Sequence, residues 1–128
     1  VKKVYKKLYF NIIIFFYTVI LYIKFNNLSF RNIITTVESQ KVNSSFFEVN
    51  PNVVLELVRA YLNKCFNNTN CLLRSAISFV VLKRLGISVN FYIGVNYDKN
   101  IESHAWLEIK KKPILEPSIE KYKVIYQF

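Results

Sequence analysis

The sequence is poor in cysteine, histidine and acidic residues, and each shortage excludes a class of protein. It contains two cysteines, one histidine and eight acidic residues among 128. Two cysteines, Cys65 and Cys71, are too few for a secreted disulfide framework, so we expect free thiols in a reducing, cytoplasmic compartment. A single histidine cannot form the cysteine–histidine cluster of a metal site, and we predict neither a metal nor a cofactor.

The excess of basic residues gives a net charge of +10, which first suggests a nucleic-acid partner. The lysines, however, gather at residues 2–7 and 110–112, without a ribbon of interleaved basic and aromatic residues. An acidic partner, a peptide or a lipid headgroup fits this distribution equally well, and we predict no nucleic-acid binding. Hydrophobic residues make up 52% of the chain, which excludes disorder, and the length suits a single domain.

The N-terminal segment combines a lysine cluster with an apolar run at residues 8–23. No small-x-small cleavage site follows the run, which argues against a cleaved signal peptide. As a helix it would rise about 24 Å, less than the roughly 30 Å of a hydrocarbon core, although Lys7 and Lys24 could snorkel. The positive-inside rule would leave Cys71 outside the membrane. A membrane span, a membrane surface contact and a buried helix all stay open for residues 8–23.

Hydrophobic periodicity and end signals predict helices first and strands afterwards. The expected helices cover residues 8–23, 28–39, 51–66 and 70–86, and the expected strands cover 88–96, 103–109 and 122–128, with a turn at 110–113 and a returning segment at 114–117. We predict an α+β fold in which a central, cysteine-bearing helix packs on a small antiparallel sheet. A basic, apolar segment at residues 1–45 would precede the core at residues 46–128.

The helix expected at residues 70–86 carries the first chemical signal. Asn70 is a good N-cap, Gly86 is a good C-terminal stop, and the residues between them are apolar on nearly every side, as in a buried helix. Cys71 is its first residue, where unpaired amides and the helix dipole favour a thiolate, so we interpret Cys71 as a nucleophile. Cys65 is the competing thiol, but it falls on the apolar stripe of the preceding helix near its C-terminal end, where the dipole disfavours a thiolate.

A thiol nucleophile needs a base and a group that orients the base. His104 is the single histidine, and its strand can lie at the N-terminus of a helix packed on the sheet. An odd loop near residues 110–112 would pair Glu116 with Trp106 on the face of His104, within reach of the imidazole. An even loop would place Glu116 on the opposite face. Glu108 shares the face of His104 but lies about 13 Å along the strand, which is too far.

The same residues also have structural explanations. A cysteine in an apolar helix is most often part of a core, and a lone histidine is most often structural. Trp106 and the tyrosines fit a core role, and the lysines at 110–112 fit a solvated turn. Residue types and spacing alone leave the catalytic and the structural interpretations open.

Four short motifs, in order and with compatible spacing, resemble those of the transglutaminase-like leader peptidases of lasso-peptide biosynthesis. They are Cys71-Leu72-Leu73-Arg74-Ser75, Leu85-Gly86-Ile87, Tyr92-Ile93-Gly94-Val95 and His104-Ala105-Trp106-Leu107-Glu108. The similarity covers residues 50–128 and implies a transglutaminase/papain-like core with cysteine peptidase activity. It makes Cys71 the nucleophile, His104 the general base and then acid, and Glu116 the orienting acid, at a position where the family usually has aspartate. Arg74, Ser75 and Trp106 would support the site.

The resemblance also implies a substrate and partners. The enzyme would remove the leader from a ribosomally made precursor peptide and so expose the α-amine of the core peptide. A separate ATP-dependent lasso cyclase would then join that amine to a side-chain carboxylate. Such peptidases generally act with a small leader-recognition protein, and because no room for a fused one precedes the catalytic region, we expect a separate partner chain.

Two other functions stay open at this point. The same residues could transfer the acyl group to an amine instead of water, as a transglutaminase-like ligase does. The chain could instead be a non-catalytic, membrane-associated assembly protein, an alternative that the glutamate at position 116 keeps open.

Overall fold

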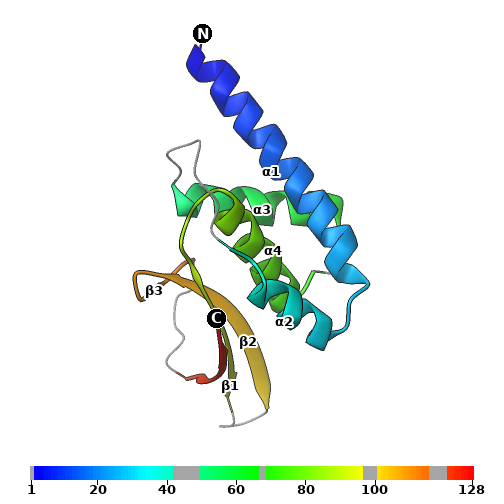
Figure 1. Cartoon of the computed structure of the whole chain (residues 1–128), viewed down its shortest axis with the longest axis vertical. Helices are drawn as coiled ribbons and strands as arrows, with labels where there is room; N and C mark the ends of the chain where they lie inside the picture. The colour runs from blue at the N-terminus through cyan, green and yellow to red at the C-terminus, as the bar shows by residue number, and fades with distance from the viewer. Residues whose placement is uncertain (1, 42–49, 67–68, 97–100, 116–120) are drawn as a thin grey trace.

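The computed structural model of the chain describes residues 2–41, 50–66, 69–96, 101–115 and 121–128 (Figure 1). Its elements are α1 (Lys2–Asn26), α2 (Phe30–Glu38), α3 (Pro51–Cys65), α4 (Cys71–Arg84), β1 (Asn90–Asn96), β2 (Glu102–Ile109), β3 (Lys112–Pro113) and β4 (Lys123–Gln127). The strands form one antiparallel sheet in the order β3-β2-β1-β4. The helices lie to one side of this sheet, and α4 is the helix that packs on β1 and β2 (Figure 1). The predicted α+β fold is confirmed.

The two ends of α4 are set by the residues that mark them in the sequence. The side chain of Asn70 accepts a hydrogen bond from the amide of Leu73 at 2.8 Å, as an N-cap does. At the other end Gly86 adopts a φ of 86°, and the amide of Ile87 donates to the carbonyl of Leu82 at 3.0 Å. This is the Schellman arrangement, which needs a residue that tolerates positive φ. Both ends of α4, and with them its first turn, are therefore fixed by local contacts.

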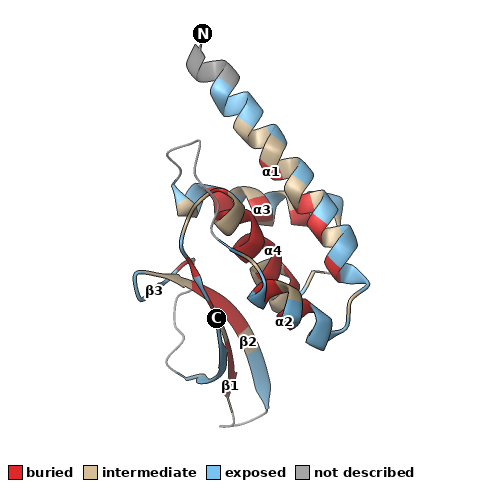
Figure 2. Cartoon of the chain, in the orientation of Figure 1, coloured by how far each residue is buried: buried red, intermediate tan, exposed pale blue. Residues whose placement is uncertain are grey.

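The core is built around α4, which Figure 2 shows as the most continuously buried element. Its buried residues are Leu73, Ala76, Ile77, Ser78, Phe79, Val80, Val81 and Leu82. The inner face of the sheet contributes Phe91, Ile93, Ala105 and Leu107, and α3 contributes Val54, Leu55, Val58 and Leu62. The prediction of a central, buried helix is confirmed. Because α4 is packed between the sheet and the other helices, its N-terminus is fixed relative to β2.

The helix α1 is longer than the predicted 8–23, and it packs on α3 and α4 through one face. Ile14, Thr18, Leu21 and Phe25 of that face are buried. The segment Lys6–Asn26 is long and apolar enough to cross a membrane by length and composition, a test that core helices and signal sequences also pass.

The hairpin between β2 and β3 has a two-residue turn, which is the even one of the two loops left open for Glu116. Ile109 pairs with Lys112, so Lys110 and Lys111 alone form the loop. These two residues have φ values of 52° and 66°, the signs required at the centre of a type I′ turn. Such a turn matches the right-handed twist of the strands, which favours an even loop although neither residue is glycine or asparagine.

Of the returning segment predicted at residues 114–117, Ile114 still pairs with β2 and Leu115 does not. The amide of Ile114 still donates to the carbonyl of Leu107 at 3.0 Å, but Leu115 adopts a φ of 55° and leaves the extended conformation. A left-handed residue turns the chain away from the neighbouring strand, so β3 is limited to Lys112–Pro113. Residues 116 and 117 lie outside the described residues.

Candidate active site

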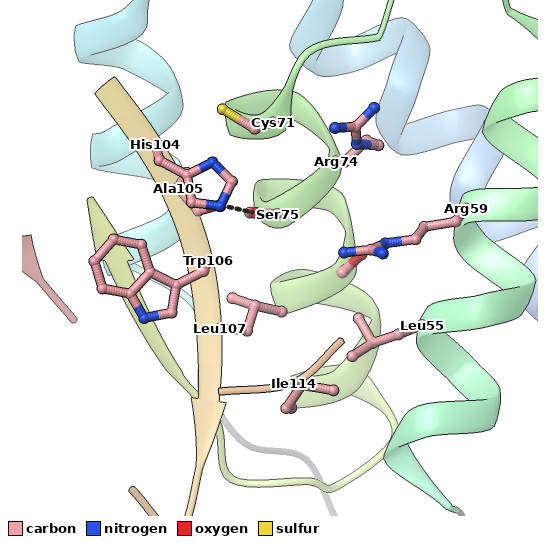
Figure 3. A pocket seen from close by; sticks show the side chains of 11 residues that line it. Leu55, Arg59, Cys71, Arg74, Ser75, His104, Ala105, Trp106, Leu107 and Ile114 are labelled. Carbon is pink, nitrogen blue, oxygen red and sulfur yellow. Dashed lines mark hydrogen bonds between the residues drawn. The ribbon is translucent and has the colours of Figure 1, made fainter. Parts of the chain in front are cut away.

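Cys71 and His104 line the same pocket, between the first turn of α4 and the strand β2 (Figure 3). Cys71 is the first residue of α4, and His104 is the third residue of β2. Both residues are half-buried, so solvent and a substrate can reach them. The structure therefore brings together the two residues that the sequence predicts as nucleophile and base.

Cys71 lies in the first turn of α4, where a helix can stabilise a bound anion. The first backbone amides of a helix have no acceptor within the helix, and they form the positive end of the helix dipole. Asn70 takes up the amide of Leu73 and leaves the amides of Cys71 and Leu72 as first-turn donors. An anionic oxygen bound beside the sulfur is stabilised by this arrangement.

Ser75 links α4, which carries Cys71, to β2, which carries His104. It lies one helical turn after Cys71, and its hydroxyl donates a hydrogen bond of 3.1 Å to the carbonyl of Ala105. Ala105 directly follows His104 in β2. This contact fixes the spacing of α4 and β2 beside the pocket.

The imidazole of His104 lies against a cluster of aromatic rings formed by Tyr92, Trp106 and Tyr122. Its ring centroid is 5.2 Å from that of Tyr122 and 6.0 Å from that of Trp106, with both pairs stacked. Trp106 is only 1% exposed, and its indole donates to the carboxylate of Glu108 at 2.9 Å. Burial, and secondly the charge of Glu108, raise the pKa of Tyr92, which therefore stays neutral beside the indole. The cluster restricts the positions that the imidazole can adopt.

Gly94 leaves the room that this aromatic cluster needs. It pairs with His104 across β1 and β2. A Cβ atom at this position would lie 2.8 Å from the Cβ of Tyr122 and 2.9 Å from two ring carbons of Trp106. These separations are shorter than van der Waals contact, so the residue opposite the histidine has to be glycine for the cluster to form.

Comparison with protein-family models matches residues 23–127 to the transglutaminase-like superfamily. The chain belongs to this superfamily. Its members generally include cysteine peptidases and transglutaminases, which agrees with a pocket that holds a thiol and an imidazole. Comparison with curated proteins and with solved structures finds no match. The superfamily part of the resemblance is therefore confirmed.

In this transglutaminase-like domain Arg74 also lines the pocket, as the motif around Cys71 suggested. Its guanidinium group donates to the carbonyl of Thr69 at 3.5 Å, the long limit of a hydrogen bond. The contact ties the residues before α4 to its first turn. Arg74 thus lies where it can support the position of the thiol and add positive charge beside it.

Arg59 is a pocket residue that the sequence analysis did not identify. It projects from α3 together with Leu55, one turn earlier, and forms the wall opposite β2 (Figure 3). Its spacing of four residues from Leu55 places the two side chains on one face of α3, but no local pattern in the sequence places that face beside Cys71. With Arg74 it gives the pocket two guanidinium groups, whose positive charge favours an anionic group bound there.

Cys65 is exposed, and its predicted place on the apolar stripe of α3 is wrong. It is the last residue of α3, and Phe66 after it leaves the helix with a φ of −140°. The ring of Phe66 stacks on Tyr22 of α1 at 3.6 Å, so Phe66 and not Cys65 makes the apolar contact there. Cys65 does not line the pocket of Cys71.

Glu116 lies outside the described residues, so its part in the site stays a prediction. Its pairing with Trp106 required an odd loop, and the turn has two residues. Continued regularly, this register would set residue 116 opposite Ala105 and not opposite Trp106. The left-handed Leu115 ends that pairing one residue earlier.

Within the described part of the chain, no three His, Cys, Asp or Glu side chains lie together as metal ligands would.

Proposed function

We propose that the chain is a cysteine peptidase that removes the leader from a ribosomally made lasso precursor peptide. The observation that carries the thiol chemistry is the pocket shared by Cys71 and His104 in a transglutaminase-like domain. The substrate class rests on the resemblance of the motifs around these two residues to those of lasso leader peptidases. Superfamily membership supports the reaction type, and the motifs support its use on a leader peptide.

The reaction would proceed through an acyl-enzyme. His104 takes the proton of the Cys71 thiol, and the sulfur electron pair attacks the carbonyl carbon of the scissile peptide bond. The carbonyl oxygen becomes an oxyanion, which the amide of Cys71 at the start of α4 can stabilise. When the C–N bond breaks, His104 gives its proton to the departing amine of the core peptide. Water, deprotonated by His104, then hydrolyses the thioester and releases the leader.

Two partner proteins belong to this proposal. A separate leader-recognition protein would present the precursor peptide, and an ATP-dependent lasso cyclase would use the amine that cleavage exposes. The orienting acid would be Glu116, an assignment that rests on the family pattern alone, because the two-residue turn does not give the pairing with Trp106.

The proposal is tested by replacing each cysteine in turn. Cys71→Ala should abolish cleavage of the precursor peptide, with a loss of about a thousandfold or more, because the other thiol, Cys65, does not line the pocket. Cys65→Ala removes an exposed thiol outside the pocket and should keep the rate within about twofold. Mass spectrometry of the two peptide products measures both rates in the presence of the leader-recognition protein. Cleavage by Cys71→Ala, or its loss in Cys65→Ala, contradicts the assignment of the nucleophile.

Acyl transfer to an amine is the second candidate function, since the superfamily also includes transglutaminases. Both reactions share the acyl-enzyme and differ in the nucleophile that resolves it. Incubation of the precursor with an added primary amine distinguishes them by product mass. A leader that ends in a free carboxylate indicates hydrolysis, and a leader that carries the amine indicates a transferase.

A further inference from the structure

The helix α1 has a second apolar face, which is exposed. Its large side chains recur three or four residues apart and are about half exposed: Leu8 56%, Ile12 44%, Phe16 57%, Ile20 57% and Ile23 59%. That spacing places them in one stripe along the helix. Figure 2 shows α1 with exposed residues along its length, and its N-terminal part extends past the other helices. A continuous apolar stripe of this kind marks an interaction surface.

The opposite face of α1 is fixed in the protein core. Ile14, Leu21 and Phe25 belong to the core cluster, and the guanidinium group of Arg84 lies 5.4 Å over the ring of Tyr17. Tyr17 stands near the middle of the apolar run. A membrane span through residues 8–23 would therefore carry Arg84 and the adjoining helices into the hydrocarbon, where a charged group is costly. The folded domain therefore cannot keep its core if α1 crosses a membrane.

The charges beside the exposed stripe are all positive. Lys6 and Lys24 are exposed near its two ends, and the sequence has no Asp or Glu between Lys2 and Asn26. Lysines that flank an apolar stripe can extend their ammonium groups to lipid phosphates while the stripe enters the headgroup region. Two copies of α1 packed on each other would instead bring lysines together without acidic partners. Charge complementarity thus favours an anionic surface over a second copy of the chain.

We propose that α1 lies in the plane of an anionic membrane surface and binds it through Leu8, Ile12, Phe16, Ile20 and Ile23. The buried face of the helix keeps the domain attached, and the lysines at its ends supply the electrostatic attraction. Binding of this kind depends both on apolar area and on anionic lipid, and salt weakens the second contribution.

The experiment measures flotation of the purified chain with lipid vesicles. Phosphatidylcholine vesicles containing about a third phosphatidylglycerol should bind the wild type, and vesicles of phosphatidylcholine alone should bind at least about tenfold less. The variant Ile12→Ser with Phe16→Ser and Ile20→Ser should lose about tenfold or more in binding to the anionic vesicles. Its matched control replaces three exposed apolar residues outside α1, namely Val53→Ser, Ile101→Ser and Val124→Ser, and should bind as the wild type does.

A second variant tests the charges without changing the apolar stripe. Lys6→Gln with Lys24→Gln should bind anionic vesicles about tenfold more weakly, and about 0.5 M NaCl should weaken the wild type in the same direction. Equal binding by the serine variant and the wild type overturns the proposal. So does resistance of the vesicle-bound chain to alkaline carbonate, which indicates a span. A wild type that ignores vesicles but forms a dimer that the serine variant abolishes also overturns it, in favour of a second copy.

Discussion

The hydroxyl of Ser75 links the thiol-bearing helix to the histidine-bearing strand through its hydrogen bond of 3.1 Å to the carbonyl of Ala105. Ser75→Ala should lower kcat for the proposed leader cleavage by about tenfold, because the side chains proposed as nucleophile and base, Cys71 and His104, depend on the spacing of α4 and β2. The free energy of unfolding should fall by only about 1 kcal/mol, the value of one hydrogen bond. Ser75→Thr keeps a hydroxyl and should recover most of the activity.

The matched control for this variant is Ser39→Ala. The Ser39 hydroxyl also donates to a backbone carbonyl, that of Thr36 at 2.7 Å, but at the end of α2. Ser39→Ala should leave kcat and the pH profile of Cys71 alkylation unchanged. If Ser75→Ala has the same kcat and the same pH profile of alkylation as Ser39→Ala, the contact with Ala105 serves stability alone.

Gly94 tests whether the aromatic cluster positions the imidazole. In Gly94→Ala the new methyl group meets the Cβ of Tyr122 at 2.8 Å, an atom that cannot move without its backbone. We expect a loss of about 1–3 kcal/mol in unfolding free energy from overpacking. Because His104 stacks on the displaced rings, kcat should fall as well. Thermal unfolding and the cleavage rate measure the two effects.

Gly86→Ala provides the comparison, because it strains the backbone away from the pocket. Gly86 has a φ of 86° at the end of α4, so alanine there costs about 1 kcal/mol. Its cleavage rate, measured well below the unfolding temperature, should equal that of the wild type. An equal loss of rate in both glycine variants would show that lowered stability alone explains the Gly94 result.

At the scale of elements, the sequence predicts those whose ends are set by local chemistry. Asn70 and Gly86 delimit α4 because an asparagine cap and a left-handed glycine act on the nearest turn alone. Asn50 with Pro51 starts α3 for the same reason. The alternation of Phe91, Ile93 and Val95 likewise predicts β1. In these segments local preference and tertiary packing favour the same structure.

The parts of the site that the sequence does not predict depend on register and on packing between distant elements. The choice between an even and an odd loop rests on the conformation of Lys110 and Lys111, and lysine is not a residue that signals positive φ. Arg59 reaches the pocket because α3 crosses beside α4, which no local pattern encodes. Cys65 follows the apolar spacing of α3, yet the helix ends before a partner covers it. One-residue differences of this kind decide which side chains meet.

At the scale of the whole molecule, α1 has a buried face and an exposed face with different roles. Its buried face joins the same core as α3, α4 and the sheet, and its exposed face is the stripe proposed to bind lipid. The family match also begins within α1, at residue 23. Substitutions within α1 can therefore test the contributions of the two faces one at a time.

Phe25 and Phe16 make that separation measurable, because the same substitution acts on opposite faces of α1. Phe25 is 1% exposed in the core, so Phe25→Ala should lower the unfolding free energy by about 3–5 kcal/mol through lost burial and a cavity. Phe16 is 57% exposed, and Phe16→Ala should change it by less than about 0.5 kcal/mol while weakening vesicle binding. Urea unfolding followed by circular dichroism measures both, with one cooperative transition expected for the wild type. If Phe25→Ala is as stable as Phe16→Ala, α1 is not part of the core, and the argument against a membrane span no longer holds.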